Sequence, residues 1–166
     1  MKRNISLIGM AGVGKSFTAK RLANHLGYEY VELDKLISEE ASRIGVRKEF
    51  LADDKFLSLE EKSMLSVKDK ADAVIDTGGS IIYLPKAMKI LREISFVVYL
   101  FDSPENIKKR FDERGEPHLI GMSKKMTFEK LLTNRISLYE KYADFKIKVS
   151  DNKDDLLSMI MGNYNK

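Results

Sequence analysis

Short apolar runs alternate along the chain with segments whose apolar residues recur at helical spacing. The clearest helical segment covers residues 15–26, where Ala19, Leu22 and Leu26 fall at i, i+3 and i+7. This alternation is typical of βαβ units and predicts an α/β fold, with helices on both faces of a parallel sheet. The predicted strands are residues 5–8, 30–33, 73–76, 96–101 and 145–149.

The other helical segments have weaker boundaries in the sequence. Residues 35–69 are predicted to be mostly helical, with breaks near Gly45 and at Asp53–Asp54. Pro85 is placed in the first turn of a further helix, where proline is tolerated. Residues 112–125 contain glycine, proline and charged residues without periodicity, so we expect a loop. The remaining helices are predicted over about 104–111, over roughly 127–142, and from residue 154 onward.

The composition is that of a globular protein. The chain has 166 residues, 43% of them hydrophobic and 33% charged, which suffices for a buried core. The absence of cysteine excludes a disulfide scaffold, a thiolate metal site and a cysteine nucleophile. A net charge of +4 favours anionic ligands, but acidic and basic residues are interleaved and form no stripe for nucleic acid. No apolar run is long enough to span a bilayer. We expect a single domain over residues 1–166, monomeric and cytoplasmic, with neither a nucleic-acid nor a membrane partner.

The segment Gly9–Ser16 matches the phosphate-loop pattern G-x-x-x-x-G-K-[ST]. An apolar run precedes it and a helical pattern follows, which is the context that the motif requires. In such a loop Lys15 reaches the β- and γ-phosphates, and the hydroxyl of Ser16 binds Mg²⁺. A dinucleotide site would need G-x-G-x-x-G and would leave Lys15 and Ser16 without a role. The alternative is an ordinary glycine-rich turn.

Glu32 and Asp34 alternate with apolar residues at the end of the second predicted strand. Alternation predicts that both carboxylates lie on one face of that strand, roughly 7 Å apart. One of them could hold Mg²⁺ through water, and the other could accept the proton of an attacking hydroxyl. The alternative is a solvated strand end.

Asp76 ends a third apolar run and is followed by Gly78 and Gly79. An apolar strand that ends in aspartate has the form of a Walker B element, whose carboxylate holds Mg²⁺ or orients Ser16. Glycine allows backbone amides to approach a ligand closely. Taken alone, the same residues could be a strand followed by a turn.

Three arginines are candidate anion-binding residues. Arg135 falls on the apolar stripe of the helix near residues 127–142, seven positions after Phe128, and an inward-facing arginine needs an anionic partner. That partner could be a substrate carboxylate or phosphate, or a structural Asp or Glu. Arg110 and Arg114 could stack on a nucleotide base or contact phosphates, or could be solvated at the surface.

Taken together, these motifs resemble the shikimate kinase family over nearly the whole chain. The family's order and spacing are matched by the phosphate loop, Glu32-Leu33-Asp34, Phe56 with Glu60, Thr77-Gly78-Gly79, and Arg135 with Tyr139. The resemblance implies a five-stranded parallel sheet of order 2-3-1-4-5, a substrate-binding segment at about 33–62 and a lid at about 112–124. It implies transfer of the γ-phosphoryl group of ATP to the 3-hydroxyl of shikimate, with Mg²⁺.

The resemblance also implies a role for individual residues. Lys15 and Asp34 would be catalytic, and Ser16, Glu32 and Asp76 would serve the metal. The nucleotide would be bound by Gly12, Val13, Gly14, Lys15, Ser16, Phe17, Arg110 and Arg114. The substrate would be bound by Asp34, Leu57, Gly78, Gly79 and Arg135.

The departures from the family pattern fall on the acceptor side. Leu57 replaces an arginine that binds the substrate carboxylate, and Ser80 replaces the third glycine. Glu116 replaces a phosphate-contacting arginine of the lid, for which Arg114 could compensate. A charged hydrogen bond of this kind contributes about 1.5–3 kcal/mol. Two alternatives therefore stay open: a kinase for another small acceptor (a polyol, a sugar acid or a nucleotide), or a nucleotide-binding regulatory protein without kinase activity.

Overall fold

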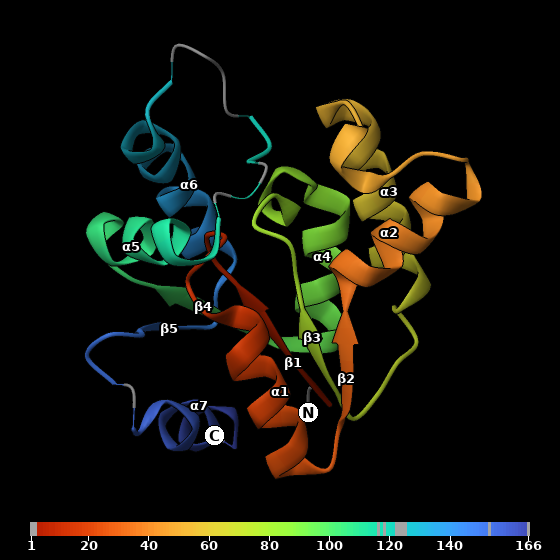
Figure 1. Ribbon diagram of the computed structural model, residues 1–166. Helices are drawn as coiled ribbons and strands as arrows, with labels where there is room; N and C mark the ends of the chain where they lie inside the picture. Colours follow the sequence, from red (N-terminus) through yellow and green to blue (C-terminus); the bar gives the residue numbers. More distant parts are fainter. Residues whose placement is uncertain (1–2, 116, 118, 122–125, 153, 166) are drawn as a thin grey trace.

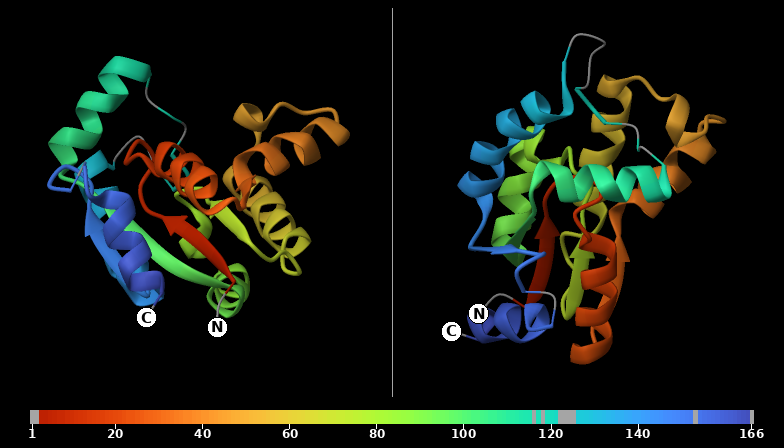
Figure 2. Two further views of the ribbon diagram at one scale, coloured as in Figure 1. Left: turned by 90° about the horizontal axis from the view of Figure 1, so that it is seen from below. Right: turned by 60° about the vertical axis from the view of Figure 1, so that its left-hand side comes forward.

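The computed structural model describes residues 3–115, 117, 119–121, 126–152 and 154–165. Its centre is a parallel sheet of five strands in the order β2-β3-β1-β4-β5, with helices on both faces (Figures 1 and 2). This confirms the predicted architecture and strand order. The strands are β1 (Asn4–Ile8), β2 (Glu29–Glu32), β3 (Ala73–Asp76), β4 (Ser95–Phe101) and β5 (Phe145–Lys148).

Local capping residues set several helix boundaries. Ser103 and Thr127 each accept a hydrogen bond from the backbone N–H three residues later, which starts α5 and α6. Pro85 begins α4, as predicted. The helices are α1 (Lys15–Leu26), α2 (Leu33–Arg43), α3 (Asp53–Ser66), α4 (Pro85–Ile94), α5 (Pro104–Arg114), α6 (Phe128–Tyr142) and α7 (Leu156–Tyr164), with short 3₁₀ helices η1 (Lys48–Phe50) and η2 (Ile81–Tyr83).

The middle of the sheet is β1, whose five residues are all buried. It pairs in parallel with β3 on one side and β4 on the other. Leu7 of β1 and Glu32 of β2 both lie in register with Asp76 of β3. The carboxyl ends of three neighbouring strands therefore meet at one edge, which is where ligands bind in open α/β sheets.

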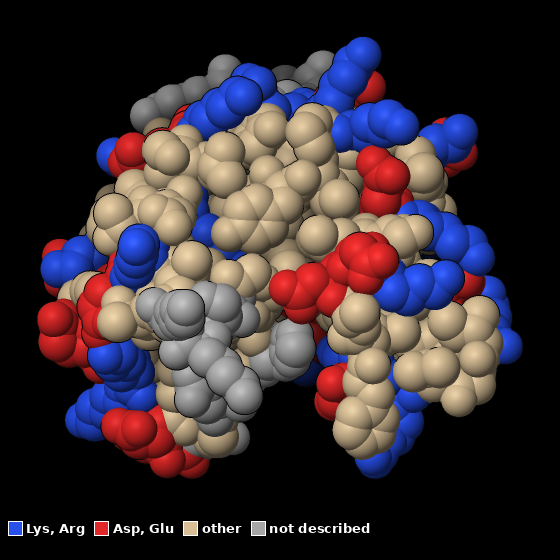
Figure 3. Space-filling model, turned by 90° about the horizontal axis from the view of Figure 1, so that it is seen from above, with Lys and Arg blue, Asp and Glu red and all other residues tan. Residues whose placement is uncertain are grey.

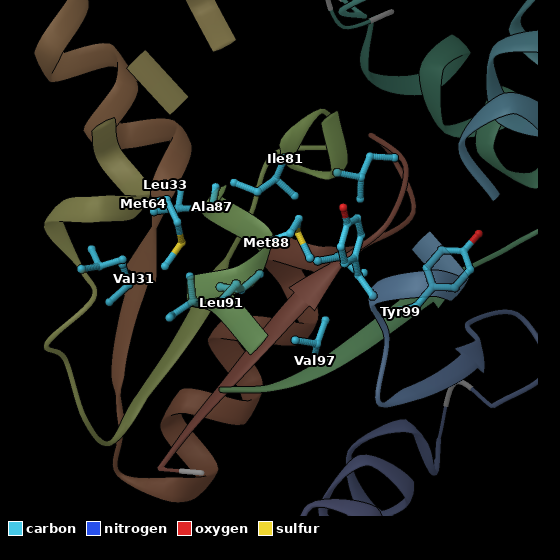
Figure 4. Packing of buried hydrophobic residues seen from close by; sticks show 14 of the residues in the cluster. Val31, Leu33, Met64, Ile81, Ala87, Met88, Leu91, Val97 and Tyr99 are labelled. Atoms are coloured by element: carbon cyan, nitrogen blue, oxygen red, sulfur yellow. The ribbon is translucent and has the colours of Figure 1, made fainter. Parts of the chain in front are cut away.

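Two apolar layers hold helices against the sheet. On one face, α1 and α7 pack on β1, β3, β4 and β5. On the other face, residues of α3, α4 and α6 pack against the same sheet, and Figure 4 shows this layer. Each apolar side chain that is fully buried contributes about 1.5–3 kcal/mol, so these layers stabilise the scaffold on which the loops are carried. The residues labelled in Figure 4 are Val31, Leu33, Met64, Ile81, Ala87, Met88, Leu91, Val97 and Tyr99.

Two smaller clusters build the walls on either side of the strand ends. Ile37 and Ala41 of α2 pack with Leu51 and with Leu59 of α3, which joins these two helices into one arm. Across from it, α5 and α6 form the opposite arm, and they pack together in a second cluster with Met10 and other apolar residues. The α2–α3 and α5–α6 arms are separated in Figure 1 by the edge at which the strands end.

One predicted boundary differs from the structure in a way that matters for the site. β2 ends at Glu32 and α2 begins at Leu33, so Asp34 lies in the first turn of a helix and shares no strand face with Glu32. Leu33, Ile37 and Ala41 are fully buried at i, i+4 and i+8. This helical periodicity outweighs the short alternation that predicted a strand.

The helix α5 is also longer than predicted. It continues to Arg114 and ends at Gly115, which has a φ of 89° that favours glycine. The first residues of the predicted loop at 112–125 are therefore helical, because Phe111 on the same helix keeps an apolar anchor near its end. None of the helices in the described part of the chain is long and apolar enough to cross a bilayer.

Candidate active site

The phosphate loop connects β1 to α1, in the strand–loop–helix context that the motif predicted. Gly12 has a φ of +76°, and a Cβ placed there would lie 2.6 Å from Cε1 of Phe111. Glycine is therefore required both by the backbone conformation and by the packing of α5. The first turn of α1, which begins at Lys15, leaves backbone N–H groups without helical partners. These groups and the helix dipole favour a bound phosphate.

Lys15 is buried against this loop, with 8% of its surface exposed. Its ammonium donates hydrogen bonds to the carbonyl oxygens of Gly9 (2.9 Å) and Met10 (3.1 Å). Burial lowers the pKa of Lys15, and the carboxylates of Asp76 and Asp34 act in the opposite direction. A phosphate oxygen in the loop would offer this ammonium a charged partner, which makes a stronger hydrogen bond than a carbonyl does.

A cavity of about 390 Å³ opens beside the loop. Figure 3 looks onto this end of the molecule, where the surface is notched and acidic and basic side chains are interspersed. The volume suits a small-molecule ligand. Of the residues predicted to form the site, the cavity is lined by Gly12, Lys15, Ser16, Glu32, Asp34, Asp76, Gly78, Gly79 and Arg135.

Other predicted residues are placed elsewhere. Leu57 is half-buried and is not among the residues that line the cavity, whereas its neighbour Phe56 is. Phe17 is 67% exposed, with the guanidinium of Arg21 5.4 Å from its ring centre. Val13 is buried within the phosphate loop, and Gly14 is the residue immediately before α1. The side chain of Arg114 and the residue Glu116 lie outside the described part of the chain.

The metal side of the cavity contains Ser16, Glu32 and Asp76. Asp76 is 4% exposed, and its Oδ2 accepts a hydrogen bond of 3.0 Å from the hydroxyl of Tyr30. Burial and the carboxylate of Asp76 raise the pKa of Tyr30. Among the described residues, no three acidic or histidine side chains form a metal cage by themselves. Mg²⁺ commonly takes one or two protein carboxylates together with substrate phosphates and water, so this set of oxygen donors fits that ion.

Asp34 reaches the cavity from the start of α2 and is paired there with a lysine. Oδ2 of Asp34 lies 2.9 Å from Nζ of Lys48, which comes from η1. The side chains of Asp34 and Lys48 are 48% and 23% exposed. Asp34 therefore faces the cavity with its charge balanced by a cation that lines the same space.

Glu60 is a fully buried acid behind the cavity wall. Its Oε2 accepts a hydrogen bond of 2.7 Å from the hydroxyl of Ser80, while Oε1 has no hydrogen-bond partner among the described residues. Burial raises the pKa of Glu60 to about 7, against the opposing effect of the Ser80 hydrogen bond. A Cβ on Gly78 would lie 2.4 Å from Oε1, so any larger residue at this position would force the buried side chain of Glu60 to move.

Arg135 is buried on α6 with 1% of its surface exposed, as the apolar stripe predicted. Its guanidinium donates to the hydroxyl of Tyr83 (3.0 Å), to Sδ of Met10 (3.3 Å) and to the carbonyl oxygen of Ile120. All three partners are neutral. Among the described residues, the guanidinium thus forms no ion pair with a carboxylate, and it lines the cavity with its charge available.

Arg110 lies on the other side of the phosphate loop. It donates to Asp102 (2.6 Å) and, more weakly, to the carbonyl oxygen of Gly12 (3.3 Å). Asp102 is itself held by Asn106 and by the backbone N–H of Ser103. This network holds Arg110 beside Gly12 of the loop, and Arg110 is not among the residues that line the cavity.

The structure adds residues that the sequence motifs did not single out. Tyr30 lies two positions before Glu32 on the same strand, so the alternation of β2 could have identified it. Lys48 lies in a break between helical segments, where no periodic signal exists. The further lining residues are Ala11, Lys48, Glu49, Pro117, Leu119 and Ile120, together with Phe56, Thr77 and Ser80, which the comparison with the family pattern had named.

Comparisons with known proteins point to one family. The model of the shikimate kinase family matches residues 11–163. The chain is 33% identical over 148 residues to a shikimate kinase of Dehalococcoides mccartyi, covering 88% of this chain and 84% of that protein. It is 34% identical over 148 residues to a shikimate kinase of Geobacter sulfurreducens, covering 87% of this chain and 81% of that protein.

The fold is also found among solved structures. The shikimate kinase from Acinetobacter baumannii, determined in complex with shikimate, aligns with a TM-score of 0.81 over 100% of this chain and 97% of that chain, at 24% identity. That likeness supports the fold. On the family match and the sequence identities, the chain belongs to the shikimate kinase family.

Proposed function

We propose that this protein is an ATP-dependent phosphotransferase that moves the γ-phosphoryl group of ATP to a hydroxyl of shikimate or of a closely related hydroxylated acid. The observation that carries the proposal is one cavity with Lys15 of the phosphate loop and Asp34 among its lining residues. Phosphoryl transfer depends mainly on placing donor and acceptor in line and on neutralising charge, and this arrangement supports both. Membership of the shikimate kinase family supports the donor, the acceptor class and Mg²⁺.

Each group has a separate task in this proposal. Lys15 and the backbone N–H groups of the loop bind the phosphates, and Arg110 contacts the nucleotide base. Ser16, Glu32 and Asp76 would hold Mg²⁺, which would neutralise charge on the phosphates. Asp34 accepts the proton of the acceptor hydroxyl as that oxygen attacks phosphorus. The carboxylate of Asp34, which already faces the cavity, then carries this proton.

The test is an ADP-release assay with Mg-ATP, with and without shikimate at high concentration, in which the phosphorylated product is identified by mass spectrometry. We expect acceptor-dependent ADP release and one phosphate added to shikimate. Asp34→Asn should lower kcat by about 10²–10⁴-fold, the usual contribution of a general base, while ADP still binds. ADP release that does not depend on any acceptor would contradict the proposal.

The same assay separates the two alternatives. A panel of polyols, sugar acids and nucleosides at equal concentration would reveal another acceptor, if one of them is used better than shikimate. A regulatory protein without chemistry would bind ADP and transfer phosphate to none of them. Transfer that disappears in Asp34→Asn excludes this second alternative.

A further inference from the structure

Lys48 brings a positive charge into the acceptor side of the cavity from a segment that has no periodic pattern. It lies on η1, between α2 and α3, and its side chain lines the cavity. Its ammonium is 2.9 Å from Oδ2 of Asp34, and 23% of its side chain is exposed. A partly buried ammonium this close to the proposed base is within reach of an acceptor that Asp34 contacts.

Arg135 brings a second positive charge to the same region. The Gly78–Gly79 turn is close both to Asp34, the partner of Lys48, and to Arg135: a Cβ on Gly78 would be 3.6 Å from Oδ1 of Asp34 and a Cβ on Gly79 would be 3.3 Å from Nη1 of Arg135. The hydrogen-bond partners of Arg135 among the described residues are neutral. A buried guanidinium that no carboxylate pairs needs an anion, and the cavity is where one can enter.

The other charged residues of the cavity do not satisfy this need. Lys15, Glu32 and Asp76 line the phosphate and metal side. Glu49 also lines the cavity but is exposed, so solvent screens its charge. Leu57 is not a lining residue and has no charge. The buried acid Glu60 lies close enough to Arg135 for their charges to interact, but it does not line the cavity. Among the residues that line the acceptor side, Lys48 and Arg135 are therefore accompanied by two carboxylates, Asp34 and the solvent-screened Glu49.

We propose that Lys48 determines acceptor specificity: together with Arg135 it binds the carboxylate of a hydroxylated acid, so the enzyme selects an anionic acceptor over neutral polyols and sugars. This inference rests on the proposed function and names a residue that sets its substrate class. A lysine ammonium has three donors on a flexible stem, so it can contact Asp34 and an acceptor carboxylate together. Lys48 thereby supplies the charge that Leu57 cannot.

The experiment compares shikimate with its methyl ester, which keeps the hydroxyls and lacks the negative charge. Lys48→Met should raise KM for shikimate by about 10- to 100-fold, the usual size of a charged hydrogen bond. We expect KM for the ester and KM for ATP to change less than about threefold. Lys48→Arg, which keeps the charge, should retain most of the affinity. Lys55→Met is the matched control, because Lys55 is an exposed lysine of α3 outside the cavity lining.

The outcomes separate this inference from the proposed function. If Lys48→Met raises KM for shikimate and for the ester equally, Lys48 only positions Asp34 and the inference is wrong. If it raises neither KM, the inference is wrong while the proposed function stands. If the wild-type protein phosphorylates neither shikimate nor another hydroxylated acid, the proposed function fails and this inference fails with it. ADP-induced thermal stabilisation verifies that each variant is folded, and Lys48→Gln provides a second neutral variant.

Discussion

The hydroxyl of Tyr30 donates a hydrogen bond of 3.0 Å to Oδ2 of Asp76, across the boundary between β2 and β3. Asp76 is buried at the end of β3 beside Ser16 and Glu32, in the part of the cavity suited to Mg²⁺. The bond occupies one carboxylate oxygen and fixes the plane of the group. Tyr30 therefore fixes the orientation of Asp76, which would hold Mg²⁺ in the proposed function.

Replacing Tyr30 by Phe removes this hydrogen bond and keeps the ring. We expect the Mg²⁺ concentration for half-maximal activity to rise by about 10-fold, because residues behind a metal ligand commonly affect metal affinity or activity by 10–100-fold. The measurement is ADP release against free Mg²⁺ at saturating ATP and acceptor. Tyr28→Phe is the control, since its hydroxyl faces Tyr164 at 3.5 Å. An unchanged Mg²⁺ dependence would show that Asp76 is oriented without Tyr30.

Lys15→Met separates the catalytic role of this lysine from any structural one. We expect kcat to fall by about 10²–10³-fold, the usual effect of removing one donor to charge that develops in a transition state. Burial lowers the pKa of Lys15, which means that the folded protein bears a desolvation cost for this ammonium. The variant should therefore unfold at the same temperature as the wild type or higher when no nucleotide is present.

Thermal unfolding and activity are measured together on Lys15→Met and on Lys86→Met, a change at an exposed position of α4. The control should retain full activity. A Lys15 variant that loses activity only because it unfolds would contradict the proposed role.

The phosphate loop and Asp76 could be predicted from sequence because their chemistry is carried by neighbouring residues. Gly12, Lys15 and Ser16 stand within five positions, and Asp76 ends an apolar run. The buried position of Arg135 also followed from helical spacing. Its partners did not, because Met10, Tyr83 and Ile120 come from three distant segments.

The acceptor side was less predictable for the same reason. The pair of Lys48 and Asp34 depends on how the segment after α2 folds back over its first turn, and no local pattern encodes that path. Asp34 lines the cavity, but its element was predicted wrongly, since a short alternating run predicted a strand where the chain begins a helix. The absence of Leu57 from the cavity lining likewise could not be seen from spacing alone.

Gly12→Ala tests whether the loop depends on its left-handed glycine. The alanine would have to adopt a φ of +76°, and its Cβ would meet Cε1 of Phe111 at 2.6 Å. We expect a loss of about 1–3 kcal/mol in the free energy of unfolding, together with weaker ADP binding. Gly162→Ala is the matched control: nothing lies within 4 Å of its Cβ, and it lies inside α7. That change should raise the free energy of unfolding by about 0.5–1 kcal/mol. Equal effects of the two substitutions would contradict this account.

We expect the contribution of Glu60 to the free energy of unfolding to fall as pH rises. Burial raises the pKa of Glu60 in the folded protein from 4.5 to about 7. Between these values the folded state binds more protons than the unfolded chain, so the free energy of unfolding decreases with increasing pH. This decrease begins near the pKa of Glu60 in the unfolded chain and is complete above the pKa of Glu60 in the folded protein. A shift of this size corresponds to about 3 kcal/mol.

Glu60→Gln removes this titration and keeps an oxygen that can accept the hydrogen bond from Ser80. Urea unfolding between pH 5 and 8 should show the variant close to the wild type at pH 5 and more stable by up to about 3 kcal/mol at pH 8. Titrations that both proteins share cancel in the difference. Glu61→Gln, at the neighbouring half-buried position of α3, should instead follow the wild-type slope. If the wild type and Glu60→Gln have parallel profiles over this range, Glu60 is ionised throughout it, and its buried oxygen has a partner other than Ser80.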